Sequence, residues 1–470
     1  MSNSLSRIFR LGMGDFYMEA EKQGKINQIT EGVIWKQLLI FFFPIVFGTF
    51  FQQIYNTADT VVVGRFVGKE ALAAVGGSAS QIVNLIVGFF VGLSSGASVV
   101  VAQYYGAEDE DKLKRTLHTA FAFSILAGIV IGTAGFVFSE NILKMMHTPS
   151  EIMEDSMRYL HIYFSGMVFN LVYNMGAGIL RAVGDSKRPL YVLMVTCALN
   201  IVLDVAFVVL FQLDVAGVAI ATVISQAVSA VLVLWMLAST RELYHLSLWK
   251  IRLHKKQLLS ILRIGLPTGM ESVMYNISNV VIQVFVNALG TDTVAAWTTV
   301  GKIDAFYWMV INAFEISITT FVGQNYGAGK YQRMRKSVKV CMGIALASAI
   351  VVSGLLLLLR TPVFGLFTTD SGVISIGTGM LRFLLPSYPI YVIIGILSGA
   401  MRGTGNVLVP MALTCGGVCL LRIVWLFAAT PLYPGMNTIM ASYPISWSIT
   451  AVFFILYYFK KFPGRTPRKR

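Results

Sequence analysis

Two aspartates, Asp59 and Asp204, lie in stretches of otherwise apolar residues. A charged side chain at the centre of a bilayer costs roughly 2.5–3.5 kcal/mol on insertion scales, so a carboxylate at that depth requires a partner or a function. Asn200 lies four residues before Asp204 and shares its helix face, while Asn174 and Thr222 place further oxygen atoms in neighbouring apolar stretches. These five residues could hold a hard monovalent cation, or the two carboxylates could share a proton.

Structural roles are the alternative for all five residues. Asp59 could lie solvated at a helix end near the membrane surface, and Asp204 could form a purely structural hydrogen bond. Asn and Thr side chains commonly join helices inside membranes, so Asn174, Asn200 and Thr222 could do no more than that. The residue types alone leave both interpretations open.

The second half of the chain also carries ionisable residues in apolar stretches. Lys302 and Asp304 are two residues apart, and we expect them to neutralise each other as a structural pair. Glu271 and Glu315 could line a cavity for cationic molecules or form paired struts, and Arg422 is a further cation deep in an apolar stretch. Aromatic faces and adaptable Met side chains suit flat cationic ligands, although core packing is the alternative for each of them. The residues expected to line a substrate cavity are Gln52, Tyr55, Met175, Glu271, Tyr275, Trp308 and Glu315.

The composition indicates which elements position these residues. The chain has 470 residues, of which 56% are hydrophobic and only 13% are charged, with a mean hydropathy of +0.70. A soluble domain carries about a quarter charged residues. The sequence therefore predicts an all-α integral membrane protein with twelve transmembrane helices. The predicted spans are 34–62, 70–104, 114–138, 156–182, 189–211, 215–239, 258–289, 294–326, 336–360, 372–401, 407–430 and 438–459.

An internal repeat divides these spans into two halves. Gln103–Ala107 ends the second span and Gln324–Ala328 ends the eighth, at an offset of 221 residues that also relates Arg181 to Arg402. Pro44 and Pro267, which we expect to bend the first and seventh helices, match within two residues of that offset. Several matches at one offset predict two six-helix bundles, related by a pseudo-two-fold axis along the membrane normal. The predicted parts are a tail (1–33), an N-lobe (34–239), a linker (240–257), a C-lobe (258–459) and a basic tail (460–470).

The net charge of +14 follows the membrane topology rather than a nucleic-acid surface. Most Lys and Arg residues lie in the tails and in alternate loops, which predicts the inner membrane of the cell with both termini in the cytoplasm. The basic tail is expected to contact anionic lipid. Four scattered cysteines and five histidines show no metal or redox spacing, and a phosphate-binding loop is missing. We expect no enzyme activity, no cofactor beyond a coupling ion, and a monomer.

Several stretches together resemble the multidrug and toxic compound extrusion (MATE) transporters, over essentially the full chain. They are Pro44–Gly68, Ala71–Val75, Gln103–Ala107, Leu180–Pro189 and Met401–Pro410. The first span is most similar to the bacterial DinF-like branch, which implies a cation-coupling role for Asp59, for the pair Asn200 and Asp204, and, by spacing, for Asn174 and Thr222. The NorM-like branch uses acids of the second half for sodium, but Glu271 does not match their spacing. The resemblance implies export of cationic or amphipathic compounds against inward proton or sodium flow.

A flippase for lipid-linked oligosaccharides, from the same wider superfamily, is the alternative function. Such a protein more often has extra helices and a cation-rich cavity for phosphate, whereas the N-lobe candidates here are acidic. A membrane scaffold without transport activity would not explain two carboxylates with polar neighbours at membrane depth. The sequence thus favours an antiporter, and it does not choose between proton and sodium.

Overall fold

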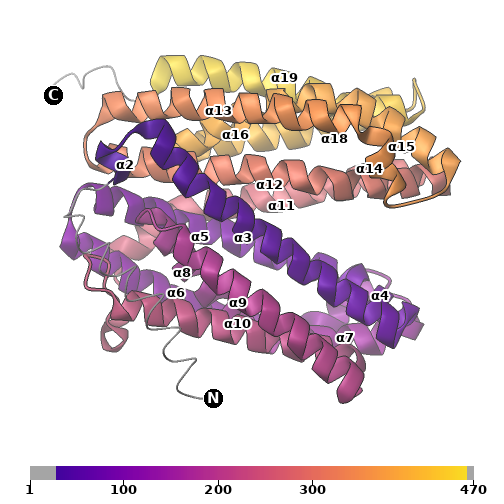
Figure 1. The fold of residues 1–470 in the computed structure, drawn as a ribbon, viewed down its shortest axis with the longest axis horizontal. Helices are drawn as coiled ribbons and strands as arrows, with labels where there is room; N and C mark the ends of the chain where they lie inside the picture. The colour runs from indigo at the N-terminus through magenta and orange to yellow at the C-terminus, as the bar shows by residue number, and fades with distance from the viewer. Residues whose placement is uncertain (1–27, 463–470) are drawn as a thin grey trace.

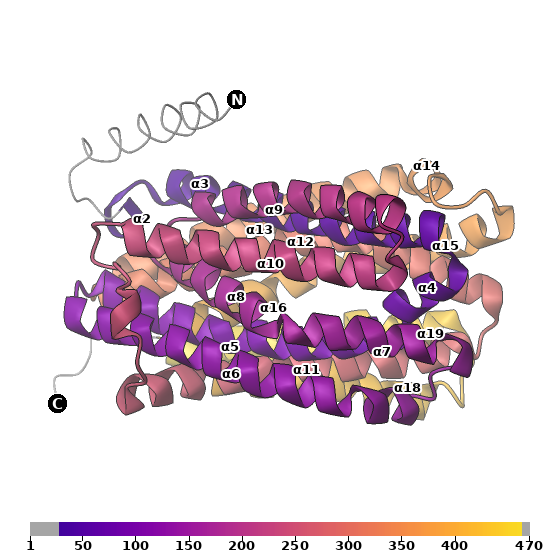
Figure 2. The same ribbon diagram turned by 90° about the horizontal axis from the view of Figure 1, so that it is seen from below.

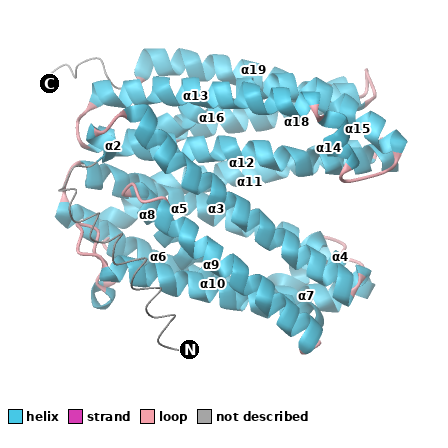
Figure 3. Cartoon of the chain, viewed as in Figure 1, coloured by secondary structure: helices cyan, strands magenta, loops and turns pink. Residues whose placement is uncertain are grey.

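The computed structural model describes residues 28–462, and within that range every regular element is a helix (Figure 3). The first 27 residues of the predicted N-terminal tail lie outside the described residues, as do Arg465, Arg468, Lys469 and Arg470 of the basic tail. The long helices run along one common axis (Figure 2). Many apolar side chains on their outer faces are exposed, such as Val137 and Phe138 at 60% and 54%, as expected of a surface that faces lipid.

The N-terminal half forms the first bundle, drawn from indigo to magenta in Figure 1. A short helix, α2 (Gln28–Glu31), precedes it. The bundle contains α3 (Ile34–Val62), α4 (Lys69–Ala74), α5 (Ser80–Gly106), α6 (Glu110–Met145), α7 (Ser150–Ser165), α8 (Met167–Ala182), α9 (Lys187–Val205) and α10 (Asp214–Ser239). Wider π-helical turns at Val63–Val67, Val75–Ala79 and Ala206–Leu210 extend α3, join α4 to α5, and extend α9.

The C-terminal half forms the second bundle, drawn from pink through orange to yellow in Figure 1. It contains α11 (Lys255–Asn287), α12 (Thr291–Gly327), α13 (Tyr331–Leu358), α14 (Arg360–Gly365), α15 (Ser371–Leu384), α16 (Tyr388–Gly403), α17 (Leu408–Leu413), α18 (Leu421–Ala429) and α19 (Met436–Lys461). A π-helical turn at Thr414–Leu420 joins α17 to α18. The all-α fold in two bundles that the sequence predicts is confirmed.

Ten helical segments in the described range are long and apolar enough to cross a membrane. The polar start of α11 and the division of α7 from α8 account for the two other predicted spans, so the arrangement agrees with twelve. The predicted span 156–182 is interrupted at Gly166, and 372–401 at Leu385–Ser387. Pro386 and the poor helix former Gly166 explain why these spans are each built from two pieces.

At Pro44, where the sequence predicts a bend, α3 continues without a break from Ile34 to Val62 (Figure 1). Likewise, α11 continues through Pro267. A proline removes one backbone hydrogen bond, so the carbonyl of Ile40 lacks its usual donor four residues later. Neighbouring helices hold α3 on both sides of that point, which explains why the helix continues.

Helices α5 and α11 join the two bundles along a line of glycines. A Cβ atom on Gly92 would lie 2.7 Å from the backbone of Gly269, and one on Gly96 would meet the backbone of Gly265. Such close backbone approach is typical of small residues at helix contacts in membranes. Close to α2, Arg333 donates to the carbonyl of Ile29 and Arg335 to that of Phe462, so both described chain ends lie at one end of the molecule. We call this the terminal end.

Candidate functional site

A polar cluster lies inside the N-lobe, where α3, α9 and α10 meet. The carboxyl group of Asp59 on α3 faces Asp204 and Asn200 on α9 and Thr222 on α10. Asn200 and Asp204 are completely buried, and Thr222 is 3% exposed. The four-residue spacing on α9 places its two side chains on one face, as the sequence predicts, and α3 packs along that face. Four of the five predicted ion-coupling residues are thus brought together.

The polar atoms of this cluster are buried without well-formed hydrogen bonds. In the described part of the chain, this holds for Asp59 Oδ1, for both carboxylate oxygens of Asp204, for both amide atoms of Asn200 and for Thr222 Oγ1. Two buried carboxylates that face each other cannot both stay ionised without a positive charge between them. Carboxylate, amide and hydroxyl oxygens also suit a hard cation. The arrangement therefore calls for a proton or a small cation.

Three tyrosines surround the cluster: Tyr55, which the sequence analysis assigns to a substrate cavity, and Tyr159 and Tyr163, which it does not single out. Tyr55 on α3 and Tyr163 on α7 lie beside Asp59, and Tyr159 on α7 lies near both aspartates. The rings of Tyr159 and Tyr163 are stacked with centroids 6.0 Å apart. Gln226 on α10 faces Tyr163. The four-residue spacing of the two α7 tyrosines puts them on one helix face, which is the signal that could have identified them.

Three residues of the predicted site lie elsewhere. Asn174 on α8 donates to the backbone oxygen of Asn170 and to its side-chain oxygen, at 2.9 and 3.1 Å, instead of to the cluster. Met175 is 2% exposed and packs in an apolar core of the N-lobe, so its assignment to a cavity is corrected. Gln52 is exposed on α3 and lines none of the cavities described below. Helix α8 begins after the interruption at Gly166, so the direction in which Asn174 and Met175 point does not follow from their sequence distance to residues on other helices.

Four of the predicted cavity residues gather in the C-lobe. Glu271, Tyr275, Trp308 and Glu315 line one cavity of about 270 Å³. Arg402 lies between the two acids, with a nitrogen 3.7 Å from Glu271 Oε1 and 3.8 Å from Glu315 Oε2. The two acids therefore line a cavity and are also paired with each other through one guanidinium.

Arg402 lies in the last turn of α16 and is the repeat partner of Arg181. A cation in the last turn of a helix commonly faces the helix end. Instead, the guanidinium of Arg402 donates to Ser398 Oγ from Nε and Nη2 at 3.1 and 2.8 Å and reaches back to the acids. A Cβ atom on Gly395 would collide with Glu315, so the glycine makes room for that carboxylate.

The expected pair of Lys302 and Asp304 is not formed. Asp304 accepts a hydrogen bond from the hydroxyl of Tyr388 on α16, whereas Lys302 is exposed. Residues two apart on a helix point to opposite sides, which is why these two do not meet. Asp304 instead lines a larger cavity of about 460 Å³ in the C-lobe.

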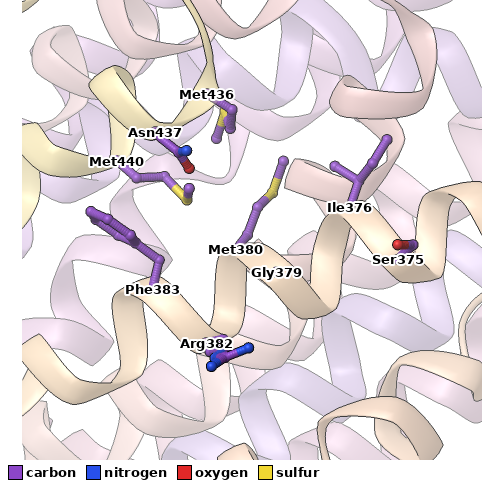
Figure 4. A pocket seen from close by; sticks show the side chains of 9 residues that line it. All are labelled: Ser375, Ile376, Gly379, Met380, Arg382, Phe383, Met436, Asn437 and Met440. Carbon is purple, nitrogen blue, oxygen red and sulfur yellow. The ribbon is translucent and has the colours of Figure 1, made fainter.

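A further cavity of about 450 Å³ lies between α15 and α19 (Figure 4). Figure 4 shows the side chains of Met380, Met436 and Met440 converging there, while Arg382 points away. None of the acids predicted from the sequence lines it.

The two copies of the repeat motif meet at the terminal end, between the lobes. Gln103 Nε2 donates to the carbonyl of Gly403 at 2.9 Å, and Gln324 Nε2 donates to that of Ala182 at 2.7 Å. A Cβ atom on Gly106 would collide with the backbone oxygen of Gln324, and the same holds between Gly327 and Gln103. The pseudo-symmetric motifs thus form one interlocked contact, which we call the inter-lobe latch.

Known proteins resemble this chain over most of its length. A family model described as MatE matches residues 44–206 and 267–427. The chain is 29% identical to the "Probable multidrug resistance protein YoeA" of Bacillus subtilis over 407 residues, which cover 84% of this chain and 87% of that protein. It is 21% identical to the "Multidrug export protein MepA" of Staphylococcus aureus over 386 residues, 82% of this chain and 85% of that one.

Solved structures share the fold. A transporter of the MOP superfamily from Pyrococcus furiosus superposes with a TM-score of 0.86 at 23% identity, over 93% of this chain and 97% of its own. The outward-facing conformation of a multidrug resistance MATE family transporter matches equally, with a TM-score of 0.86 at 23% identity over 92% and 97% of the two chains. With the family model spanning well over half of its residues, this chain belongs to the MatE family of membrane transporters.

Proposed function

We propose that this protein is a secondary active exporter that moves cationic or amphipathic small molecules out of the cell in exchange for protons or sodium ions. The observation that carries the proposal is the facing pair of Asp59 and Asp204. Asp59 Oδ1 and both carboxylate oxygens of Asp204 are buried without a hydrogen-bond partner in the described range. The names of YoeA and MepA, which refer to multidrug resistance and export, support the substrate class. The acidic N-lobe cluster does not favour a phosphate-binding flippase.

Helix α3 connects the polar cluster to the other lobe. Its second half carries Asp59, and its first half packs on the C-lobe, where Phe42 stacks on Phe314 with ring centroids 4.0 Å apart. Seventeen residues of helix separate Phe42 from Asp59, or about 26 Å. Pro44 lies between them and removes one backbone hydrogen bond, so α3 can change shape there at lower cost. A positive ion at Asp59 would thus bias how α3 seats on the C-lobe.

Exchange requires two states of the lobes. In the structure the inter-lobe latch holds them together at the terminal end. We propose that this end is cytoplasmic, that the protein resides in the inner membrane, and that the latched state faces outward. Lys330 and Arg333 lie at this end with the described chain termini, in agreement with a basic cytoplasmic side. Ion release would then accompany opening of the latch. One chain would suffice for transport, because the whole polar cluster lies within one lobe.

The test is efflux of ethidium from proteoliposomes that contain the purified full-length protein. An inward proton gradient and an inward sodium gradient are imposed separately, and the gradient that accelerates efflux identifies the coupling ion. Asp59→Asn removes the charge but keeps the shape, so it should lower gradient-dependent efflux about tenfold or more. Asp292→Asn, at an exposed position in the first turn of α12, is the matched control and should behave as wild type.

Two results would contradict the proposal. If wild-type protein shows no gradient-dependent efflux of ethidium or of other cationic dyes, the protein is not this kind of antiporter. If Asp59→Asn exports as fast as wild type under both gradients, the polar cluster does not couple ions to transport.

A further inference from the structure

The 460 Å³ cavity that Asp304 lines in the C-lobe contains a buried cation with no acidic partner among the described residues. Arg422 on α18 is 3% exposed, and its guanidinium carbon lies 4.0 Å from the ring centroid of Tyr443 and 5.9 Å from that of Trp447. Among residues 28–462, no carboxylate lies within 4.0 Å of Arg422, and its Nε has no hydrogen-bond partner. Aromatic faces offset only part of the cost of burying a charge. The cavity therefore presents an incompletely satisfied positive charge.

A second polar group lines the same cavity. One carboxylate oxygen of Asp304 accepts from Tyr388, while Asp304 Oδ1 is buried without a hydrogen-bond partner in the described range. Asp304 and Arg422 do not form an ion pair, so each of them has an unused hydrogen-bonding atom. A ligand could satisfy both, provided that it accepts from Arg422 and donates to Asp304.

The walls between these two residues are aromatic. Trp308 lies edge-on to Tyr391 with ring centroids 4.8 Å apart, and Trp447 lies 5.9 Å from Trp308. The hydroxyls of Tyr275 and Tyr391 are 2.9 Å apart, where this cavity adjoins the smaller one that holds Glu271 and Glu315. A volume of about 460 Å³ with mostly aromatic walls and few polar groups is typical of a small-molecule site.

We propose that this cavity is a C-lobe binding site for aromatic organic anions. The anionic group, a carboxylate or sulfonate, pairs with Arg422, and the planar ring system packs against Trp308 and Trp447. A hydroxyl or amine at the far end of the ligand donates to Asp304. This ligand class is opposite in charge to the cations proposed for export, and its binding does not depend on ion coupling by the N-lobe.

The experiment measures binding to purified full-length protein in lipid nanodiscs by isothermal titration calorimetry. The probe is 6-hydroxy-2-naphthoate, and the comparison ligand is 6-hydroxy-2-naphthamide, which has nearly the same shape but no charge. A charge-assisted hydrogen bond predicts that wild-type protein binds the acid at least about tenfold more tightly than the amide. Equal affinities, or no saturable binding of the acid, would overturn the proposal without any variant.

Variants then locate the site. Arg422→Gln should abolish the preference for the acid, whereas Arg382→Gln, a basic residue on α15 outside this cavity, should retain it. Asp304→Asn should weaken binding of 6-hydroxy-2-naphthoate more than binding of 2-naphthoate, which lacks the hydroxyl donor. An acid preference that survives in folded Arg422→Gln would show that the anion binds elsewhere and would refute the assignment. Loss of ethidium efflux alone would not refute the anion site, because the efflux assay tests the polar cluster of the N-lobe.

Discussion

The inter-lobe latch makes a specific prediction about a single methyl group. Gly327→Ala places a Cβ atom well inside 3.0 Å of the backbone oxygen of Gln103, where no flexible side chain can move away. Non-bonded carbon contacts need about 3.5 Å, so the two lobes must separate by about 1.5 Å at this point. Overpacking of this kind costs about 1–3 kcal/mol. Replacing glycine by alanine also raises the helix propensity, but it does so equally in the latched state and in a state with the latch open, so it does not change the free-energy difference between them.

The latched state should therefore lose about 1–3 kcal/mol relative to an opened state, which shifts the equilibrium between them about 5- to 150-fold. Spin labels at Asp111 and Gln332, two exposed and repeat-related positions at the starts of α6 and α13, report the separation of the lobes at the terminal end. The labels require a background in which the four native cysteines are replaced. Gly327→Ala should enlarge the population with long label distances.

Gly343→Ala is the matched control, because a Cβ atom on this α13 glycine would meet nothing within 4 Å. It adds the same methyl group to a helix and should leave the distance distribution unchanged. Identical distance distributions for wild type, Gly327→Ala and Gly343→Ala would refute the reasoning, because the inter-lobe latch would then not contribute to the free-energy difference between the latched and opened states. Gly106→Ala tests the pseudo-symmetric half of the latch and should act in the same direction.

Three further predictions concern stability and are checked by thermal or denaturant unfolding in detergent. Arg402→Met leaves Glu271 and Glu315 facing each other without their cation and should destabilise the protein by about 2–3 kcal/mol, which is less than the loss expected for a fully buried ion pair. Adding Glu315→Gln should restore part of this stability, and no recovery would contradict the pairing. Gly395→Ala forces Glu315 to move and should cost about 1–3 kcal/mol, whereas Gly379→Ala, which meets nothing within 4 Å, should not. Asp370→Ala removes the acceptor of the Gly372 and Val373 amides at the start of α15 and should cost about 1 kcal/mol; an unchanged midpoint would mean that water replaces the cap.

The fold could be predicted because membrane helices are specified locally. Long apolar runs can satisfy their backbone only as helices, and a repeat at constant offset fixes how the halves correspond. Interruptions within a span were harder to predict. Gly166 divides α7 from α8, yet other glycines, such as Gly96 in α5, lie within unbroken helices. Whether a glycine ends a helix depends on the packing around it, which the sequence does not display.

Within the candidate site, spacing along one helix was more informative than spacing between helices. Asn200 and Asp204 share a face because they are four apart, and the structure brings them to Asp59. Lys302 and Asp304 do not meet, because a two-residue spacing separates them around the helix; the partner of Asp304 is Tyr388, 84 residues away. Contacts between distant helices, such as that of Arg402 with Glu271, follow from tertiary packing, and single-sequence patterns do not encode them. The roles of these residues in ion coupling stay predictions.

The repeat also shows how two similar halves can differ in electrostatics. At the offset that relates Pro44 to Pro267, Asp59 corresponds to Ile282, and at the main offset Asp204 corresponds to Trp425 and Glu315 to Ser94. Carboxylates therefore lie at unrelated positions in the two lobes, although the latch motifs are retained in both.

The partners of these carboxylates differ as well. In the C-lobe a tethered guanidinium, that of Arg402, lies between the acids, so a free cation would have to compete with a charge that is always present at high local concentration. In the described part of the N-lobe, no Lys or Arg lies within 4.0 Å of Asp59 or Asp204. Of these two acid pairs, the one in the N-lobe is therefore the one that our proposal assigns to a proton or sodium ion from solution. In the function that we propose, the symmetry of the backbone would supply two lobes that move against each other. The asymmetry of the charges would assign the ion to the N-lobe and leave the C-lobe, with Arg422, to a different ligand.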